Sequence, residues 1–414
     1  MKTVKIKDIA QVEMGLSPKG ESYNFDGNGL PLLNGPTEFG TIYPNCTLYT
    51  TDSKRESEVN DLIFCVRGST TGKMNFSDKK YSLGRGVCAI RGKNYIVTKY
   101  IKYALDKYLK SLLQFANGGT FPNLCRDDIL NFEIPFNNHE KVVKFLSNYD
   151  DLIENNNRRI KILEEMAQKI YKEWFVDFKF PGHETATFKD SPLGKIPKDW
   201  NYKPIGNLLE HQIGGGWGEA KINNKYTEKA FVIRGTDIPN ARLGNIQDCP
   251  LRYHTPSNIK TRLLKVNDIV FEVSGGSKGQ PVGRTLFLNK NLFNQFKENV
   301  ICASFCKLLR VDSEQIIPEY VYLHLLNIYD NGEIEKYQTQ STGIINFKFT
   351  FFIENEKILI PTQDIINKFK NVIVPIYNEI FLLGNKNQIL KQTRDILLPR
   401  LISGEIDVEN MEIL

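Results

Sequence analysis

The chain has 414 residues, a formal net charge of +6 and seven cysteines that are scattered along the sequence. No apolar run approaches the roughly 18 residues that a membrane-spanning helix needs, and the N-terminal residues lack the apolar core of an export signal. No two cysteines form a CxxC pair, so neither a zinc site nor a disulfide framework is expected. These features predict a cytoplasmic protein with no membrane segment, long enough for two or three domains.

The first block, residues 1–138, has the pattern of a mixed α/β domain. Short apolar runs between Gly-, Asn- and Ser-rich turns predict strands at 62–66, 87–90 and 132–134. Apolar residues at helical spacing predict a helix over 97–115. Pro135 ends the block, and Asn138 is placed to cap the helix that follows.

A long helix is predicted from residue 139 to the Pro181–Gly182 pair, within a spacer segment 139–182. Apolar residues recur there at alternating steps of three and four, and only Asn156 interrupts the series. A second segment, 363–414, repeats this pattern with interruptions at Asn387 and Arg394. The predicted seams are Leu146, Tyr149, Ile153, Ile160, Leu163, Ala167, Ile170 and Trp174, and Ile373, Ile376, Ile380, Leu383, Leu390, Leu397 and Leu401. Such seams are typical of coiled coils, and the domain between them lets the two helices pair antiparallel.

Residues 183–362 contain a connector and a second block that repeats the first. The connector, 183–200, is rich in proline and glycine and is interpreted as a domain boundary. Val59–Gly68 matches Val266–Gly275, and each begins with Val-Asn-Asp before an apolar strand, which predicts a turn that leads into a buried strand. Near the start of the blocks the alignment pairs Gly15 with Gly214. The chain is therefore expected to use one unit twice.

Two segments resemble nucleotide-binding motifs, but neither fits the pattern that its motif requires. Gly68–Lys73 resembles a phosphate-binding loop, but it has one residue too few between its glycines, and Met74 stands where a magnesium-binding hydroxyl is required. Gly84–Ala89 leads into a predicted strand, whereas a dinucleotide fingerprint opens a helix. The five histidines are isolated in the sequence. No catalytic, metal or cofactor site is predicted in this chain.

Two polar loops recur at equivalent positions in both blocks. They combine glycines, hydroxyls, amides and cations at strand ends, at 67–75, 116–124, 274–284 and 338–347. Glycine lets a backbone approach a partner closely, and Arg, Gln, Asn and Thr side chains can contact base edges or phosphates. Each loop by itself could equally be a solvated turn. Their recurrence favours a binding surface that is used twice.

Several segments resemble the specificity subunit of type I restriction–modification systems. The resemblance covers essentially the whole chain, and its most specific parts are Ile170–Phe178, Ser191–Trp200, Gly214–Gly218 and Leu397–Asp407. It implies an α+β fold in which two similar mixed α/β target recognition domains are separated by two long antiparallel coiled-coil helices. It also implies a non-catalytic subunit, each of whose domains reads one half of a bipartite DNA target.

The partners implied by the resemblance are double-stranded DNA, two methyltransferase subunits that dock on the helices and hold S-adenosylmethionine, and restriction–translocase subunits. The side chains expected to contact DNA are Arg67, Lys73, Thr120, Asn123, Arg234, Lys278, Arg284, Asn346 and Lys348. Two alternatives stay open at this point. One is a coiled-coil scaffold that does not itself read DNA, and the other is an enzyme with an unrecognised site.

Overall fold

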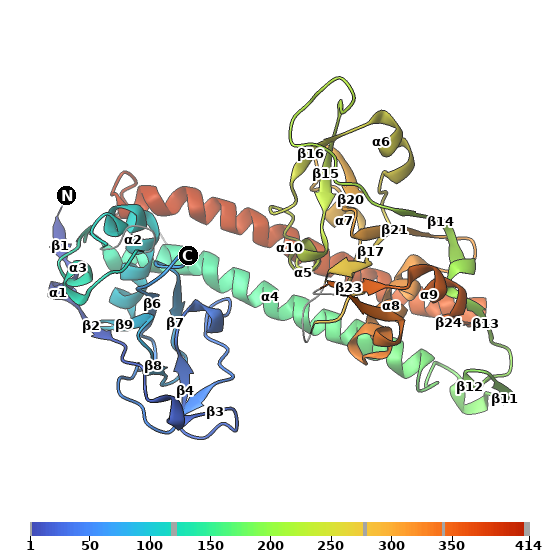
Figure 1. Cartoon of the computed structure of the whole chain (residues 1–414), viewed down its shortest axis with the longest axis horizontal. Coiled ribbons are helices and arrows are strands. Elements are labelled where there is room, and N and C mark those ends of the chain that lie inside the picture. Colours follow the sequence, from blue (N-terminus) through green and yellow to red (C-terminus); the bar gives the residue numbers. More distant parts are fainter. Residues whose placement is uncertain (1, 117–121, 276–279, 342–343, 410–414) are drawn as a thin grey trace. The chain divides into compact units, whose positions relative to one another are not determined.

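The computed structural model of the chain describes residues 2–116, 122–275, 280–341 and 344–409 (Figure 1). It divides into two compact units: Met1–Asp151 with Lys391–Leu414, and Leu152–Leu390. Helix α4 (His139–Phe175) and helix α10 (Gln363–Ile402) each contribute residues to both units. Within the described ranges, no helix is both long and apolar enough to cross a membrane.

The first unit is built on a four-stranded antiparallel sheet in the order β2-β9-β6-β7. Its strands are β2 (Ala10–Met14), β9 (Val87–Gly92), β6 (Leu62–Cys65) and β7 (Met74–Phe76). Helix α2 (Tyr95–Leu113) packs on this sheet, and its side chains share a buried cluster with Leu62, Phe64 and Ile90. The strands expected at 62–66 and 87–90 and the helix expected at 97–115 are confirmed here, with bounds shifted by one or two residues. The strand expected at 132–134 is confirmed outside this sheet, at Glu133–Pro135.

Smaller elements complete this unit. Strand β1 (Thr3–Lys5) pairs antiparallel with β10 (Glu133–Pro135) beside helices α1 (Ile6–Ile9) and α3 (Arg126–Leu130). A second small sheet, in the order β3-β5-β4-β8, consists of β3 (Tyr23–Asn24), β5 (Tyr49–Thr50), β4 (Leu30–Leu33) and β8 (Ser82–Leu83).

The second unit repeats the main sheet with the order β14-β21-β17-β19. Its strands are β14 (Leu209–Gly214), β21 (Cys306–Val311), β17 (Ile269–Glu272) and β19 (Thr285–Phe287). The pairing of β13 (Asn201–Pro204) with β24 (Lys357–Ile360) repeats that of β1 with β10. Helix α8 (Pro318–Asp330) occupies the place in the chain that α2 has in the first copy. The duplication predicted from the sequence is therefore present in the topology.

The second copy also carries elements of its own. A three-stranded sheet is formed by β16 (Leu251–His254), β15 (Glu228–Ile233) and β20 (Asn299–Cys302), and another by β18 (Ser274–Gly275), β23 (Ile344–Phe347) and β22 (Gln338–Ser341). Its short helices are α5 (Ile238–Arg242), α6 (Pro256–Arg262), α7 (Lys290–Phe293) and α9 (Phe349–Asn355).

A β-bulge shifts the correspondence between the two copies by one residue. Strand β14 has a register irregularity between Leu209 and His211, whereas β2 pairs with β9 without a break. Beyond the bulge, the glycine amide that follows the strand donates to a neighbouring strand in both copies, from Gly15 to Val87 O and from Gly215 to Cys306 O. Gly15 therefore corresponds to Gly215, and the expected match with Gly214 is wrong by the one residue that the bulge inserts.

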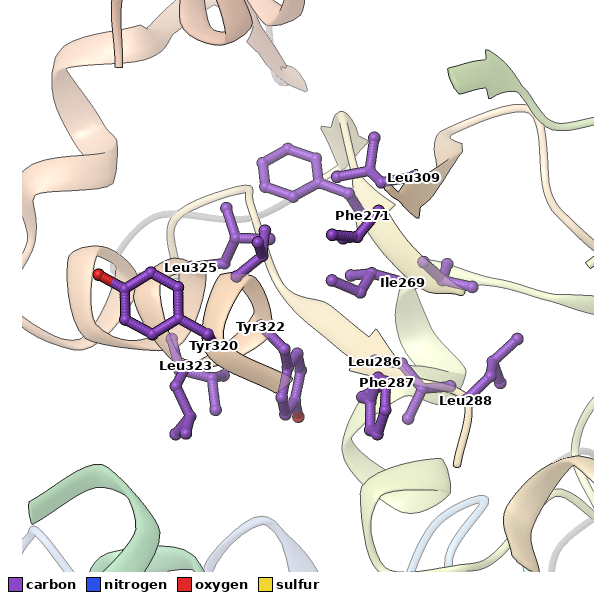
Figure 2. Packing of buried hydrophobic residues seen from close by; sticks show 14 of the residues in the cluster. Ile269, Phe271, Leu286, Phe287, Leu288, Leu309, Tyr320, Tyr322, Leu323 and Leu325 are labelled. Carbon is purple, nitrogen blue, oxygen red and sulfur yellow. The ribbon is translucent and has the colours of Figure 1, made fainter. Parts of the chain in front are cut away.

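The core of the second unit lies between its main sheet and helix α8. Figure 2 shows labelled side chains of β17, β19 and β21 beside helix α8, from which Tyr322 extends toward Phe287. The rings of Phe287 and Tyr322 are stacked, with centroids 5.6 Å apart. Phe271, Leu286 and Tyr320 are fully buried in the same cluster. The central strand β17 is buried along its whole length and is apolar except for its last residue, which is why its segment stood out in the sequence.

Eight of the fifteen predicted seam residues of α4 and α10 are buried and the other seven are half-buried. The interrupting polar residues pair with one another or with a partner. Within the second unit, Asn156 Nδ2 donates to Asn387 Oδ1 at 2.9 Å. Within the first, Arg394 forms an ion pair with Asp150 at 2.6 Å. In the second unit, Arg159 of α4 also forms an ion pair with Glu379 of α10. The residue number thus rises along α4 as that of the partner falls along α10, so the helices run antiparallel there.

Helix α4 ends at Phe175, earlier than the Pro181–Gly182 pair predicted as its end. Phe178 has a positive φ of 56°, which breaks the helical path. Phe178 and Phe180 instead pack against Trp200, with ring centroids 5.7 and 4.9 Å apart. The connector that carries Trp200 also forms a hairpin of β11 (Phe188–Ser191) and β12 (Gly194–Pro197). Aromatic packing against the connector therefore decides where the helix stops.

Candidate nucleic-acid interface

The repeated Val-Asn-Asp segments form the same turn in both copies. Asn60 and Asn267 have positive φ values of 71° and 72°, a conformation that asparagine tolerates better than most residues. The aspartate that follows accepts a backbone N–H three residues before it, from Glu58 to Asp61 at 2.7 Å and from Lys265 to Asp268 at 2.6 Å. Each turn leads directly into the central strand whose far end carries a candidate loop.

In the first copy, the two predicted loops meet where strand β6 ends. Arg67 and Asn123 form an antiparallel backbone bridge, and Arg67 Nε donates to Asn123 Oδ1 at 3.1 Å. Next to this bridge, Leu124 N donates to Val66 O at 3.0 Å. The hydroxyl of Thr71 donates to Pro122 O at 3.1 Å. Loops that lie 56 residues apart in sequence are thus joined side by side.

The second copy repeats this junction at the end of strand β17. Ser274, at the position that corresponds to Arg67, pairs with Asn346 in the β18–β23 ladder. The Ser274 hydroxyl lies 2.8 Å from Asn346 Oδ1. Phe347 N donates to Val273 O at 2.9 Å, as Leu124 N does to Val66 O in the first copy. We call these two places, Arg67–Asn123 and Ser274–Asn346, the strand-end junctions.

The predicted residues of the first copy fall at or beside its junction. Arg67 and Asn123 form it, and both are exposed. Lys73 is also exposed, and its backbone carbonyl accepts from Cys65 N at the end of β6. Thr120 lies outside the described residues.

In the second copy, Asn346 forms the junction, and exposed Lys348 lies two residues further on, immediately before α9. Lys278 lies outside the described residues. Arg234 and Arg284 are held by carboxylates. Arg284 donates to both oxygens of Glu272 at 2.5 and 2.8 Å, and its side chain is 12% exposed. These hydrogen bonds to the Glu272 carboxylate raise the pKa of the Arg284 guanidinium.

Arg234 lies in the short turn that follows β15. It donates to both oxygens of Asp237, and its Nη2 also donates to the carbonyl of Asp248 at 2.8 Å. The structure therefore gives Arg234 and Arg284 a role in holding their own loops. A DNA contact by either of them stays a prediction.

Sequence reasoning missed one exposed aromatic side chain, Trp217, which is 42% exposed in the loop after β14. The Arg252 guanidinium lies over its ring, 4.4 Å from the centroid, and donates to the carbonyls of Trp217 and Gly218. A Cβ on Gly215 would lie 2.1 Å from Cys302 O, so this glycine lets the loop cross the neighbouring backbone. The glycine run before Trp217 was the signal in the sequence that could have drawn attention to it.

No cluster of three or more His, Cys, Asp or Glu side chains suited to a metal ion occurs in the part of the chain that the structure describes. All seven cysteines are free. The polar groups that converge at the junctions are amides, a hydroxyl and a guanidinium, which suit recognition by hydrogen bonds. The arrangement therefore has the chemistry of a binding surface.

Comparison with known proteins shows which family this chain resembles. Residues 1–165 match the model of the type I restriction modification DNA specificity domain. The MjaIX type I specificity subunit of Methanocaldococcus jannaschii is 26% identical, over 98% of this chain and 94% of its own. The HindI specificity subunit of Haemophilus influenzae is 22% identical, over 97% of this chain and all of its own.

The fold agrees with a solved structure. The S subunit of the type I restriction–modification system of M. genitalium superposes with a TM-score of 0.56 at 15% identity, covering 97% of this chain and 96% of that one. The sequence matches along the whole chain and the duplicated architecture agree: the chain is similar over its full length to type I restriction–modification specificity subunits, and residues 1–165 match the model of their DNA specificity domain.

Proposed function

We propose that this chain is the sequence-reading subunit of a type I restriction–modification complex, in which each copy of the repeated domain reads one half of a bipartite DNA target. The first reader is residues 1–138 and the second lies within 183–362. The observation that carries the proposal is the repetition of the strand-end junction, in which two distant loops present exposed polar side chains at the same place in both copies.

Helices α4 and α10 are proposed to set the spacing between the half-sites and to bind two methyltransferase subunits. The surface of α4 away from its seam supports this role, because it carries exposed apolar side chains, namely Leu152, Ile162 and Met166. Exposed apolar residues on a long helix favour burial against a partner chain. Restriction–translocase subunits would join the same assembly.

The chain is proposed to be non-catalytic, with S-adenosylmethionine bound by the methyltransferase partner. The Gly68–Lys73 segment supports this, because it connects β6 to β7 of an antiparallel hairpin, whereas a phosphate-binding loop leads from a strand into a helix. A chain that only reads DNA needs no bound cofactor of its own.

The test compares three preparations on genomic DNA: the chain alone, the methyltransferase subunits alone, and the two together. Only the combination is expected to methylate adenine within a bipartite motif. Methylation by the chain alone would mean that it is an enzyme. A complex that forms normally but methylates without a sequence motif would mean that the chain is a scaffold.

A further inference from the structure

The two strand-end junctions share a backbone geometry but differ in their side chains. Both place an asparagine opposite the residue that follows the central strand. In the first copy that residue is Arg67, and in the second it is Ser274. Because the backbone pairing is the same at both junctions, the exchange of a guanidinium for a hydroxyl is a difference in the chemistry that each copy offers to a ligand.

Asn123 fixes the orientation of the Arg67 guanidinium. Its Oδ1 accepts the Nε–H of Arg67 at 3.1 Å, while the backbone bridge between the two residues holds both main chains in place. The terminal nitrogens Nη1 and Nη2 make no hydrogen bond or ion pair with any residue in the described ranges. An exposed arginine held in this way presents a pair of parallel donors whose direction is set before a ligand arrives.

Paired donors of this geometry match one base edge in duplex DNA. In the major groove, guanine presents O6 and N7 as adjacent acceptors, and a bidentate arginine is their commonest specific partner. A phosphate also accepts from arginine, but lysine can bind a phosphate as a point charge, so a phosphate contact does not require a second residue to orient the donor. The bond from Arg67 to Asn123 thus favours a base over the backbone.

We propose that Arg67, oriented by Asn123, reads a guanine through the major groove in the half-site of the first domain. Asn123 is a positioning residue in this proposal. The junction of the second domain lacks a guanidinium, so Ser274 and Asn346 read their half-site at this point with a hydroxyl and an amide. This inference rests on the proposed function and adds to it the base that the first reader requires.

The test starts from the methylated motif of the wild-type complex with its methyltransferase subunits. Oligonucleotides then carry 7-deazaguanine at each guanine of the first half-site in turn, which removes only the N7 acceptor. Wild type is expected to lose affinity at one guanine, by less than the roughly 5- to 150-fold that a complete bidentate contact is worth, because O6 stays in place. Arg67→Ala is expected to bind weakly and to be insensitive to the 7-deazaguanine substitution at that position.

Three further variants sharpen the test. Arg67→Lys keeps the positive charge but loses the paired guanidinium donors. This variant is expected no longer to distinguish guanine from other bases at the same position, while recognition of the other half-site is unchanged. Asn123→Ala is expected to lose part of the preference for this guanine. Its affinity for a target that lacks the guanine should change less than its affinity for the correct target. Lys80→Ala, an exposed lysine paired with Glu58 in the same domain, serves as the matched control and is expected to behave as wild type.

Two results would overturn the inference while leaving the proposed function intact. One is a first half-site with no guanine that responds to 7-deazaguanine in the wild-type complex. The other is an Arg67→Ala variant that weakens binding equally on all sequences and lowers the salt dependence by about one phosphate contact. If the wild-type complex showed no sequence preference at all, the proposed function itself would fail. Thermal unfolding of each variant identifies any that do not fold.

Discussion

Asp61 accepts two hydrogen bonds from the guanidinium of Arg91, at 2.8 and 2.7 Å, and Asp268 accepts the same two bonds from Arg310, at 2.7 and 2.6 Å. The partners are 30 residues apart in the first copy and 42 in the second. Both aspartates are 1% exposed and also close the turn that leads into the central strand. The ion pair therefore ties that turn to the neighbouring strand in each copy.

Loss of either aspartate should destabilise its own unit. Asp268→Ala leaves Arg310 and the amide of Lys265 without their acceptor, and is expected to lower the free energy of unfolding by about 2–4 kcal/mol. Asp52→Ala, which removes an exposed ion pair with Lys54, is the matched control and should cost less than about 1 kcal/mol. Urea unfolding measures both. Equal effects would mean that the buried pair has no special role.

The asparagines at the seam are expected to be energetically coupled. Asn387→Leu leaves Asn156 buried without its partner, which should cost about 1–3 kcal/mol. Adding Asn156→Leu to Asn387→Leu should recover most of this loss of stability. Two leucines can pack against each other in the coiled-coil seam and leave no buried amide without a partner. A double-mutant cycle on thermal stability measures the coupling, and simply additive effects would contradict it. The double variant should be more stable than the single variant, but the two helices should also pair in more than one register, because a buried polar pair specifies the register.

Glu356 is expected to make the second unit sensitive to acid. Burial alone would raise the pKa of this carboxyl, but His324, 3.3 Å away, the Tyr337 hydroxyl and Lys336 outweigh it and lower the pKa to about 2. A lowered carboxyl pKa gives stability that is complete above the unfolded pKa, near 4.3, and is lost as the pH falls toward 2. The contribution is roughly 3 kcal/mol at neutral pH.

Glu356→Gln should therefore unfold more easily than wild type at pH 7 but lose less stability between pH 5 and pH 2. Thermal unfolding across that range checks the prediction. Glu314→Gln, a change at an exposed position of the same unit, is the control. Parallel pH profiles for wild type and Glu356→Gln would show that this carboxylate is not responsible.

Sequence reasoning succeeded where local chemistry repeats itself. The Val-Asn-Asp turns, the apolar central strands and the two seams all depend on neighbours within a few residues, so their patterns are visible in the chain. The interrupting residues Asn156, Asn387 and Arg394 were visible as well, and the structure gives each of them a partner.

Features that depend on distant partners could not be predicted in this way. Nothing near Arg284 in sequence shows that Glu272 binds both sides of its guanidinium, and nothing near Arg67 shows that Asn123 faces it. The bulge at Leu209–His211 shifts one register, and packing on Trp200 shortens α4; both arise from tertiary contacts.

The proposed role of the helices as a spacer predicts a change in the target when both are lengthened. Asn156 pairs with Asn387, so positions after Arg158 and after Asn385 lie at nearly the same level of the antiparallel pair. Seven residues inserted at each place keep the heptad pattern and add about 10 Å of helix. The gap in the methylated motif should then lengthen by about three base pairs at 3.4 Å each, with both half-sites unchanged. An active complex with an unchanged gap would show that the helices do not set the spacing.

The most direct test of two independent readers is an exchange of the first one. Residues 1–138 are replaced by the corresponding segment of a relative with a different target, and the methylated motif of the complex is mapped by sequencing. The account predicts that one half-site changes to that of the donor while the other half-site and the gap stay as in wild type. A folded, active complex in which both half-sites change, or neither does, would contradict it.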